Sequence, residues 1–164
     1  MRLIRPMTLV LMLGTVATAA SAAGQTVKHI QTANSQIATA VWVGDTLYVS
    51  GQLPSPQTPA DRGRGTAAVW GNTQVQAENV FGKIEGLLKE QGLTMGDIVM
   101  MRVYMVADPA MENRLDFAGM NAAYAKFFGT PQQPNKPARS TVQVAALVTA
   151  GALLEVEVQA ARHK

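Results

Sequence analysis

Two ionisable side chains of opposite charge lie in apolar surroundings near the end of the chain. Arg139 interrupts residues 137–145, and Glu155 interrupts residues 153–158. Both segments have the apolar content of β-strands, and Pro137 suits the start of a strand. An unpaired charge is costly in such surroundings. Two opposite charges in successive strands therefore predict a pocket that uses both.

Each of these residues allows more than one interpretation. A guanidinium such as that of Arg139 can bind a substrate carboxylate through two parallel hydrogen bonds, or it can form a structural salt bridge at a subunit seam. Glu155 can act as a general base on a water molecule, or it can be the counter-ion of Arg139. Glu157 is two residues further along the same strand face. The sequence leaves open which of the two carboxylates acts.

Other polar residues give weaker signals. Ser50 is not in a G-x-S-x-G nucleophile elbow, because Tyr48 and Gln52 occupy the glycine positions, so we expect Ser50 to line a pocket wall. Asn121 interrupts an apolar helical stripe and either contacts a ligand or satisfies a buried backbone group. No group of His, Asp and Glu has metal-ligand spacing, so no metal site is predicted.

The elements that must position these residues alternate along the chain. β-rich runs lie at residues 26–32, 37–43, 46–52, 97–106, 137–145 and 153–158. A first helix is predicted from Thr73, with Gln76 completing a capping box, and a second from Asp108-Pro109 to Gly129. Gly44-Asp45 predicts a tight hairpin, and the proline-rich residues after Gln52 predict a surface loop. The order predicts an α+β fold, with one mixed sheet backed by two helices.

The same architecture predicts self-association. If both helices cover one face of the sheet, the valines and alanines of the other face require a cover of their own. We therefore expect a homo-oligomer.

The N-terminus has the pattern of a secretory signal peptide at residues 1–23. Basic Arg2 and Arg5 precede a short apolar run, and Ala20-Ser21-Ala22 fits the cleavage rule, so we expect cleavage after Ala22 or Ala23. The apolar run is too short for a permanent membrane helix. The expected product is a single domain of residues 24–164, exported to the periplasm or secreted, without a stable membrane anchor.

Charge and cysteine content exclude several functions. The chain has 14 Lys and Arg against 11 Asp and Glu, and removal of Arg2 and Arg5 leaves a net charge of +1. A near-neutral domain lacks the basic surface that nucleic-acid binding requires. With no cysteine, the chain forms no disulfide and performs no thiolate chemistry.

Five fragments in series resemble the RidA/YjgF family. They are residues 49–54 (VSGQLP), 92–99 (GLTMGDIV), 121–128 (NAAYAKFF), 137–140 (PARS) and 153–157 (LLEVE). The resemblance covers residues 37–162, in the family's order and close to its spacing. Each fragment alone is a weak signal, whereas five in order are specific.

The resemblance implies a chorismate-mutase-like fold and a homotrimer with ligand clefts between subunits. It implies hydrolysis of reactive enamines and imines to keto acids and ammonia, without metal or organic cofactor. Arg139 matches the arginine that holds the substrate carboxylate, and Glu155 matches the glutamate that positions the water. By the same resemblance the expected substrate-binding residues are Ser50, Gly51, Asn121 and Thr141.

Three departures keep other functions open. Ile37 stands near a family tyrosine, Thr141 stands where archetypal members have cysteine, and the loop at residues 57–71 is longer than in compact members. The predicted export also moves the protein away from the cytoplasmic enzymes that release 2-aminoacrylate. A non-catalytic binder of keto or amino acids, or a chaperone-like trimer, is the alternative. An altered hydrolase is a third option.

Overall fold

The computed structural model describes residues 24–162, so the predicted signal peptide at residues 1–23 lies outside the described part of the chain. The strands are β1 (Val27–Ile30), β2 (Ala40–Val43), β3 (Thr46–Gln52), β4 (Ile98–Met105), β5 (Ala138–Gln143) and β6 (Leu154–Ala161). The helices are α1 (Thr73–Glu90), α2 (Phe117–Phe127) and the 3₁₀ turns η1 (Met95–Asp97) and η2 (Pro109–Met111). No helix of residues 24–162 has the length and apolarity needed to cross a membrane.

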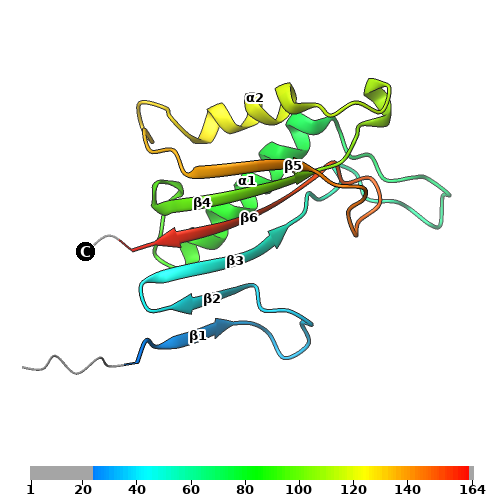
Figure 1. The fold of residues 1–164 in the computed structure, drawn as a ribbon. Coiled ribbons are helices and arrows are strands. Elements are labelled where there is room, and N and C mark those ends of the chain that lie inside the picture. Colours follow the sequence, from blue (N-terminus) through cyan, green and yellow to red (C-terminus); the bar gives the residue numbers. More distant parts are fainter. Residues whose placement is uncertain (1–23, 163–164) are drawn as a thin grey trace, which may run out of the picture.

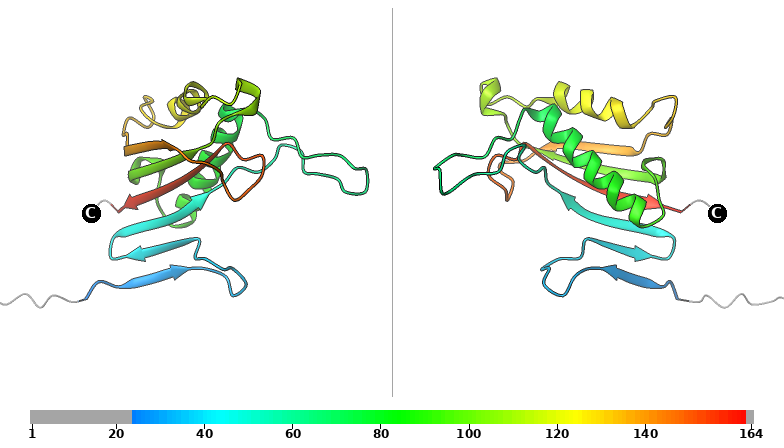
Figure 2. Two further views of the ribbon diagram at one scale, coloured as in Figure 1. Left: turned by 45° about the vertical axis from the view of Figure 1, so that its right-hand side comes forward. Right: turned by 180° about the vertical axis from the view of Figure 1, so that it is seen from behind.

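The strands form one sheet in the order β1-β2-β3-β6-β4-β5 (Figure 1). β4 and β5 run parallel, and the other neighbours are antiparallel. Both α-helices lie on the same side of this sheet (Figure 2, right). The predicted α+β class, with a mixed sheet backed by two helices, is confirmed.

Alternation along the strands separates two faces of the sheet. In β6, Leu154, Val156, Val158 and Ala160 are buried beneath the helices, whereas the residues between them point to the opposite face. Phe81 of α1 is fully buried and packs against three rings of the α2 region, those of Tyr124, Phe127 and Phe128. The core therefore lies between the helices and one sheet face.

The predicted cap of the first helix was wrong by one residue. Asn72 is the N-cap, and its Oδ1 accepts from the Val75 amide at 3.0 Å. Thr73 is inside the helix and Gln76 is buried, where it makes long-range hydrogen bonds instead of closing a capping box. Asparagine is as good an N-cap as threonine, and tertiary contacts recruit the glutamine.

Replacement of Asn72 by Ala is expected to lower the free energy of unfolding by about 1 kcal/mol, because the Val75 amide loses its acceptor. Urea unfolding should show a lower midpoint with an unchanged m-value. Gln74→Ala, in the same turn, is the control and should change the midpoint much less. Equal shifts for both variants would contradict the assignment of the cap.

The second helical segment begins later than predicted. Asp108 caps only the short turn η2, accepting from the Ala110 amide at 2.8 Å. Glu112 and Asn113 then adopt positive φ, which ends that turn, and Asp116 caps α2. The left-handed pair separates what the sequence suggested was one helix into two elements.

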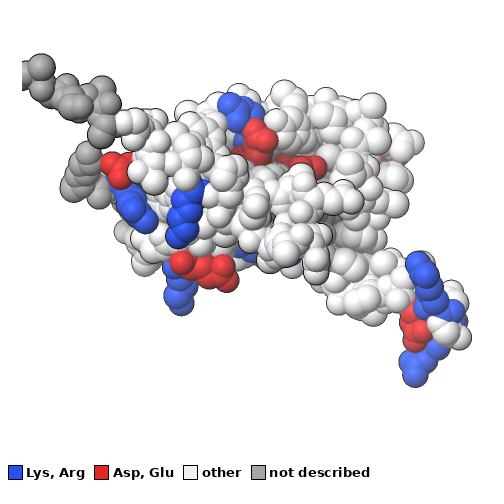
Figure 3. All heavy atoms as spheres, turned by 90° about the horizontal axis from the view of Figure 1, so that it is seen from below, with Lys and Arg blue, Asp and Glu red and all other residues white. Residues whose placement is uncertain are grey.

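Residues 53–71, here called the arm, project beyond the end of β3 (Figure 1). Isolated bridges join Thr58 to Val69 and Asp61 to Thr66, so the arm doubles back as an extended loop. Its tip carries charged side chains, seen at the lower right of Figure 3. The predicted surface loop is confirmed, and its base returns to the sheet next to α1.

The face of the sheet opposite the helices has no cover within residues 24–162. It combines apolar and polar groups, including Tyr48, Val142 and an ion pair between Arg102 and Glu157 at 2.7 Å. This mixture is less apolar than expected but is typical of a subunit interface. The oligomer, and the trimer in particular, remains a prediction.

Candidate functional site

Arg139 points to the helix side of the sheet. It is opposite buried Met101 of β4, and its Nη2 donates to Asn121 Oδ1 of α2 at 2.9 Å. Its guanidinium carbon lies 4.4 Å from the centre of the Tyr124 ring. Asn121 and Tyr124 are three residues apart on α2, so they present one face to the arginine. Two predicted site residues, Arg139 and Asn121, are thus in direct contact.

These contacts orient the guanidinium of Arg139 but leave some of its N–H donors unused. Besides Asn121, Nη1 lies 3.8 Å from Met120 Sδ, a weak acceptor. The contacts use only part of the fork of N–H donors, and half-buried Arg139 has no carboxylate partner within residues 24–162. Burial raises the pKa of Tyr124, and the charge of Arg139 opposes that rise. A preoriented cation with spare donors is suited to binding an anion.

Thr141 faces the same side as Arg139, two residues further along β5 and opposite buried Val103. Its Oγ1 is buried and has no hydrogen-bond partner among the described residues. Leaving such a hydroxyl unsatisfied costs about 1–3 kcal/mol. Arg139 and Thr141 therefore share one face of β5, and each has hydrogen-bonding capacity that the contacts among residues 24–162 leave unused.

Glu155 lies on the opposite face, against the backbone of Gly51. A Cβ at Gly51 would stand 2.8 Å from Glu155 Cδ and would overlap the carboxylate. Glu157 is already paired with Arg102, so Glu155 is the carboxylate of this strand without an ion-pair partner within residues 24–162. Of the two carboxylates, Glu155 is thus the better candidate for the general base, and its role stays a prediction.

Ser50 directly precedes Gly51, the residue that contacts Glu155, but its hydroxyl already forms a hydrogen bond. It donates to the Ala38 carbonyl at 2.7 Å, and Gln52 Nε2 donates to the Ser50 carbonyl at 2.9 Å. The bond to Ala38 attaches the segment before β2 to the irregular end of β3, where the register shifts between Val49 and Gln52. Ser50 thus fixes the backbone next to Gly51 and Glu155.

The Arg139 side chain and the Glu155 side chain do not meet within one chain. Arg139 is opposite Met101 and Glu155 is opposite Tyr104, three positions further along β4, so their side chains leave opposite faces. Strand spacing separates their backbones by about 10 Å across the sheet and about 10 Å along it. Glu155 is therefore not the counter-ion of Arg139 in its own subunit. A ligand that touches both must lie between two chains.

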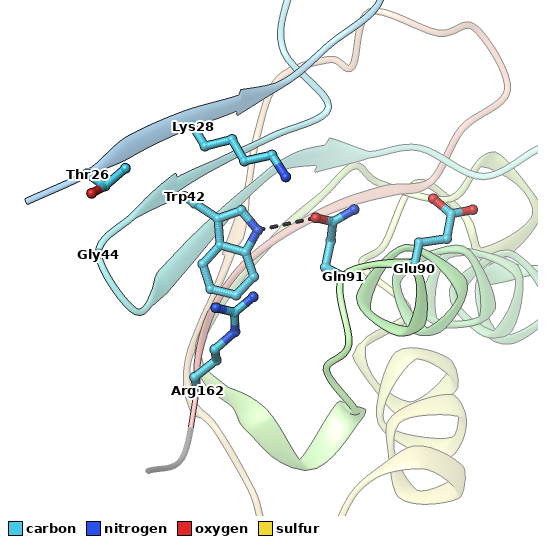
Figure 4. A pocket seen from close by; sticks show the side chains of 7 residues that line it. All are labelled: Thr26, Lys28, Trp42, Gly44, Glu90, Gln91 and Arg162. Atoms are coloured by element: carbon cyan, nitrogen blue, oxygen red, sulfur yellow. Dashed lines mark hydrogen bonds between the residues drawn. The ribbon is translucent and has the colours of Figure 1, made fainter.

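A hollow that the sequence did not reveal lies between the β1–β2 edge of the sheet and the C-terminal end of α1 (Figure 4). It has a volume of about 440 Å³ and is lined by Thr26, Lys28, Trp42, Gly44, Glu90, Gln91 and Arg162. Trp42 Nε1 donates to Gln91 Oε1 at 3.2 Å, and the Arg162 guanidinium lies over the indole at 4.3 Å. Trp42 is 6% exposed and is also part of the buried core.

Metal binding has no support among residues 24–162. No group of three or more His, Cys, Asp and Glu in this range could hold a metal ion.

Known sequences resemble this chain over most of its length. A family model described as "Endoribonuclease L-PSP" matches residues 14–162. A RutC family protein of Leuconostoc mesenteroides is 37% identical over 117 residues, covering 71% of this chain and 79% of that protein. A RutC family protein of Haemophilus influenzae is 35% identical over 108 residues, covering 66% and 73%.

Solved structures share the fold. The crystal structure of yeast Mmf1 is 34% identical, with a TM-score of 0.63, and the match covers 84% of this chain and all of that one. NMB1025 of Neisseria meningitidis, described as a member of the YjgF protein family, has a TM-score of 0.62 over 85% of this chain at 19% identity, which bears on the fold alone. The sequence matches and the shared architecture agree: the chain belongs to the RidA/YjgF family.

Proposed function

We propose that this protein hydrolyses reactive imines and enamines to keto acids and ammonia. The observation that carries the proposal is the pair of incomplete groups on opposite sheet faces. Arg139 is oriented by Asn121 and Tyr124 yet keeps free donors, while Glu155 has no ion-pair partner within residues 24–162. An arginine with free N–H donors on one face and a carboxylate without an ion-pair partner on the other suit a single site that two subunits build together.

The chemistry follows from these groups. Arg139 holds the carboxylate of an imino acid and directs its C=N carbon to a water held by Glu155 of the adjacent subunit. Glu155 accepts a proton as water adds, which gives a carbinolamine; return of a proton to nitrogen expels ammonia and leaves the keto acid. The substrate is already reactive, so positioning and one general base are sufficient.

Neighbouring residues support this assignment. Asn121 and Tyr124 fix the guanidinium, and the buried Thr141 hydroxyl can donate to a bound carboxylate oxygen. Gly51 leaves the space that the Glu155 carboxylate occupies.

The assembly that brings the two sheet faces together is the family's homotrimer, and residues 1–23 direct it to the periplasm. Mature protein beginning near Gly24 in a periplasmic fraction would support that location.

One observation favours a non-catalytic binder. Ile37, near the position of a family tyrosine, is 69% exposed and offers no hydroxyl to a ligand. A trimer that kept the Arg139 clamp but had lost this contact would still bind keto acids. The family description also names an endoribonuclease, although the net charge of the chain after residue 23 is near zero.

The test compares Glu155→Gln with Glu157→Gln. Turnover of freshly generated imino acids should fall on the order of 10²-fold in Glu155→Gln. Calorimetric titration with a keto acid should still show binding, because Arg139 is intact. Glu157→Gln, two residues away and paired with Arg102, is the matched control and should keep most activity.

Each outcome discriminates between functions. Binding without turnover by the wild-type trimer would establish the binder instead. Cleavage of RNA that Glu155→Gln abolishes would establish a nuclease. Equal turnover by both variants would contradict the assigned base.

A further inference from the structure

Gln76 is the most completely bonded buried polar side chain near the candidate site. It is 1% exposed, in the first turn of α1. Its Nε2 donates to the carbonyls of Gly71 and Gly151, each at 3.1 Å, and its Oε1 accepts from the Leu153 amide at 2.8 Å. All three bonds are to backbone groups, so Gln76 holds chain segments and not other side chains.

The segments it holds meet at the end of the sheet where Glu155 lies. Gly71 ends the arm, Gly151 belongs to the turn before β6, and Leu153 immediately precedes β6. A second contact reinforces the first, because the Trp70 indole covers Gly151 so closely that a Cβ there would lie 2.6 Å from Trp70 Cδ1. Gly151 has φ +89°, which favours glycine at this turn.

These bonds fix where β6 begins. The Leu153 amide is held by Gln76, and the Leu153 carbonyl accepts from the Val106 amide at 3.0 Å. Leu153 is thus fixed on both sides, two residues before Glu155. Because side chains alternate between faces, a slip of one residue would turn Glu155 into the core and expose Val156.

We propose that Gln76 is a positioning residue for Glu155. By fixing Leu153, the residue immediately before β6, it sets the strand register, and the register places the Glu155 carboxylate over Gly51. This inference rests on the proposed function only for its effect on turnover. The placement of Glu155 is a structural claim that can be tested without catalysis.

The test compares Gln76→Met with Gln74→Met in the mature protein, after removal of the predicted signal peptide at residues 1–23. Gln74 lies in the same turn but bonds only to Glu78 of its own helix. In Gln76→Met, kcat for imino acids should fall on the order of 10²-fold with KM unchanged, because the Arg139 clamp is intact. Gln74→Met should keep both parameters.

A second readout does not use the reaction. The ¹³C signal of the Glu155 carboxyl, assigned with Glu155→Gln, should move toward that of a solvated glutamate in Gln76→Met and stay in place in Gln74→Met. Protection of the Leu153 amide from hydrogen exchange should fall in the same variant. If the wild-type protein does not hydrolyse imines, the proposed function fails, and these two signals still decide the role of Gln76.

Gln76→Glu covers the case in which Gln76→Met does not fold. The introduced carboxyl has the same shape, and burial raises its pKa. When protonated it can donate to one of the two carbonyls, and when charged it cannot. Stability and the native Glu155 signal should therefore recover as the pH falls and be lost as it rises through that pKa.

Two results would overturn the inference. One is a folded Gln76→Met with the wild-type Glu155 signal and wild-type Leu153 protection. The other is a Gln76→Glu variant whose Glu155 signal does not change with pH relative to the wild-type protein.

Discussion

Mixing Arg139→Ala chains with Glu155→Gln chains is expected to restore about one quarter of wild-type turnover, although Arg139→Ala alone is inactive and Glu155→Gln alone is slowed on the order of 10²-fold. The reason is the geometry of the single chain. Arg139 and Glu155 leave opposite faces of the sheet, so a site that uses both takes one residue from each of two neighbours. In the proposed homotrimer, a mixture of the two variants then contains some interfaces at which both residues are intact.

The expected fraction follows from random assembly of equal amounts of the two chains. At each interface of a cyclic trimer, the arginine comes from one chain and the glutamate from the next. Each is intact with a probability of about one half, so about one quarter of the sites are complete. The chains are unfolded together, refolded and assayed on freshly generated imino acids.

A second mixture serves as the matched control. Wild-type chains mixed with Arg139→Ala/Glu155→Gln double-variant chains also give about one quarter if the site is shared between subunits. If the site lay within one chain, this mixture would give about one half and the mixture of single variants would give nothing. The ratio of the two mixtures thus decides the composition of the site, independently of the absolute rate.

Much of the fold could be predicted because its elements have strong local signals. Gly44 has φ +58° in the tight turn between β2 and β3, as the Gly-Asp pair indicated. The apolar runs of β4 and β6 and the stripe of α1 were equally clear. The start of α2 was not, because the positive φ angles at Glu112 and Asn113 divide a region that has continuous helical character in sequence.

The face that each site residue occupies could not be predicted. In β5, the rule that apolar side chains face the core and polar ones face solvent would bury Ala138 and Val142 and expose Arg139 and Thr141. The structure does the reverse: Val142 is 47% exposed, while Arg139 and Thr141 face the helix side of the sheet. The rule assumes that a single chain buries all of its apolar groups, whereas apolar side chains on this face suit contact with another subunit.

The residue types of the candidate site were therefore predicted better than their arrangement. Arg139 and Asn121 were each singled out and are joined by a hydrogen bond, and Thr141, also singled out, shares a strand face with Arg139; their role in binding stays a prediction. Gln76 was assigned a local capping role, because a long-range hydrogen bond to Gly151 or Leu153 leaves no periodic signal in sequence. Contacts between segments distant in sequence are the information that the fold adds.

Replacement of Gly51 by Ala is expected to lower turnover on the order of 10²-fold while leaving the fold intact. A Cβ at this position would overlap the Oε1 and Cδ atoms of Glu155. The backbone of Gly51 is not among those with positive φ, so alanine introduces no backbone strain. The overlap involves the end of a flexible side chain, so Glu155 rotates away at little cost in stability, and the water loses its base.

Gly86→Ala is the matched control for this substitution. A Cβ at Gly86, within α1, would meet nothing within 4 Å, and alanine in a helix stabilises by about 0.5–1 kcal/mol relative to glycine. Turnover should be unchanged there and the melting temperature slightly raised. For Gly51→Ala the melting temperature should hold while kcat falls and keto-acid binding at Arg139 persists. The alanine Cβ and the Glu155 carboxylate cannot occupy the same space. Full activity in Gly51→Ala would therefore mean that the position of Glu155 over Gly51 is irrelevant to the reaction.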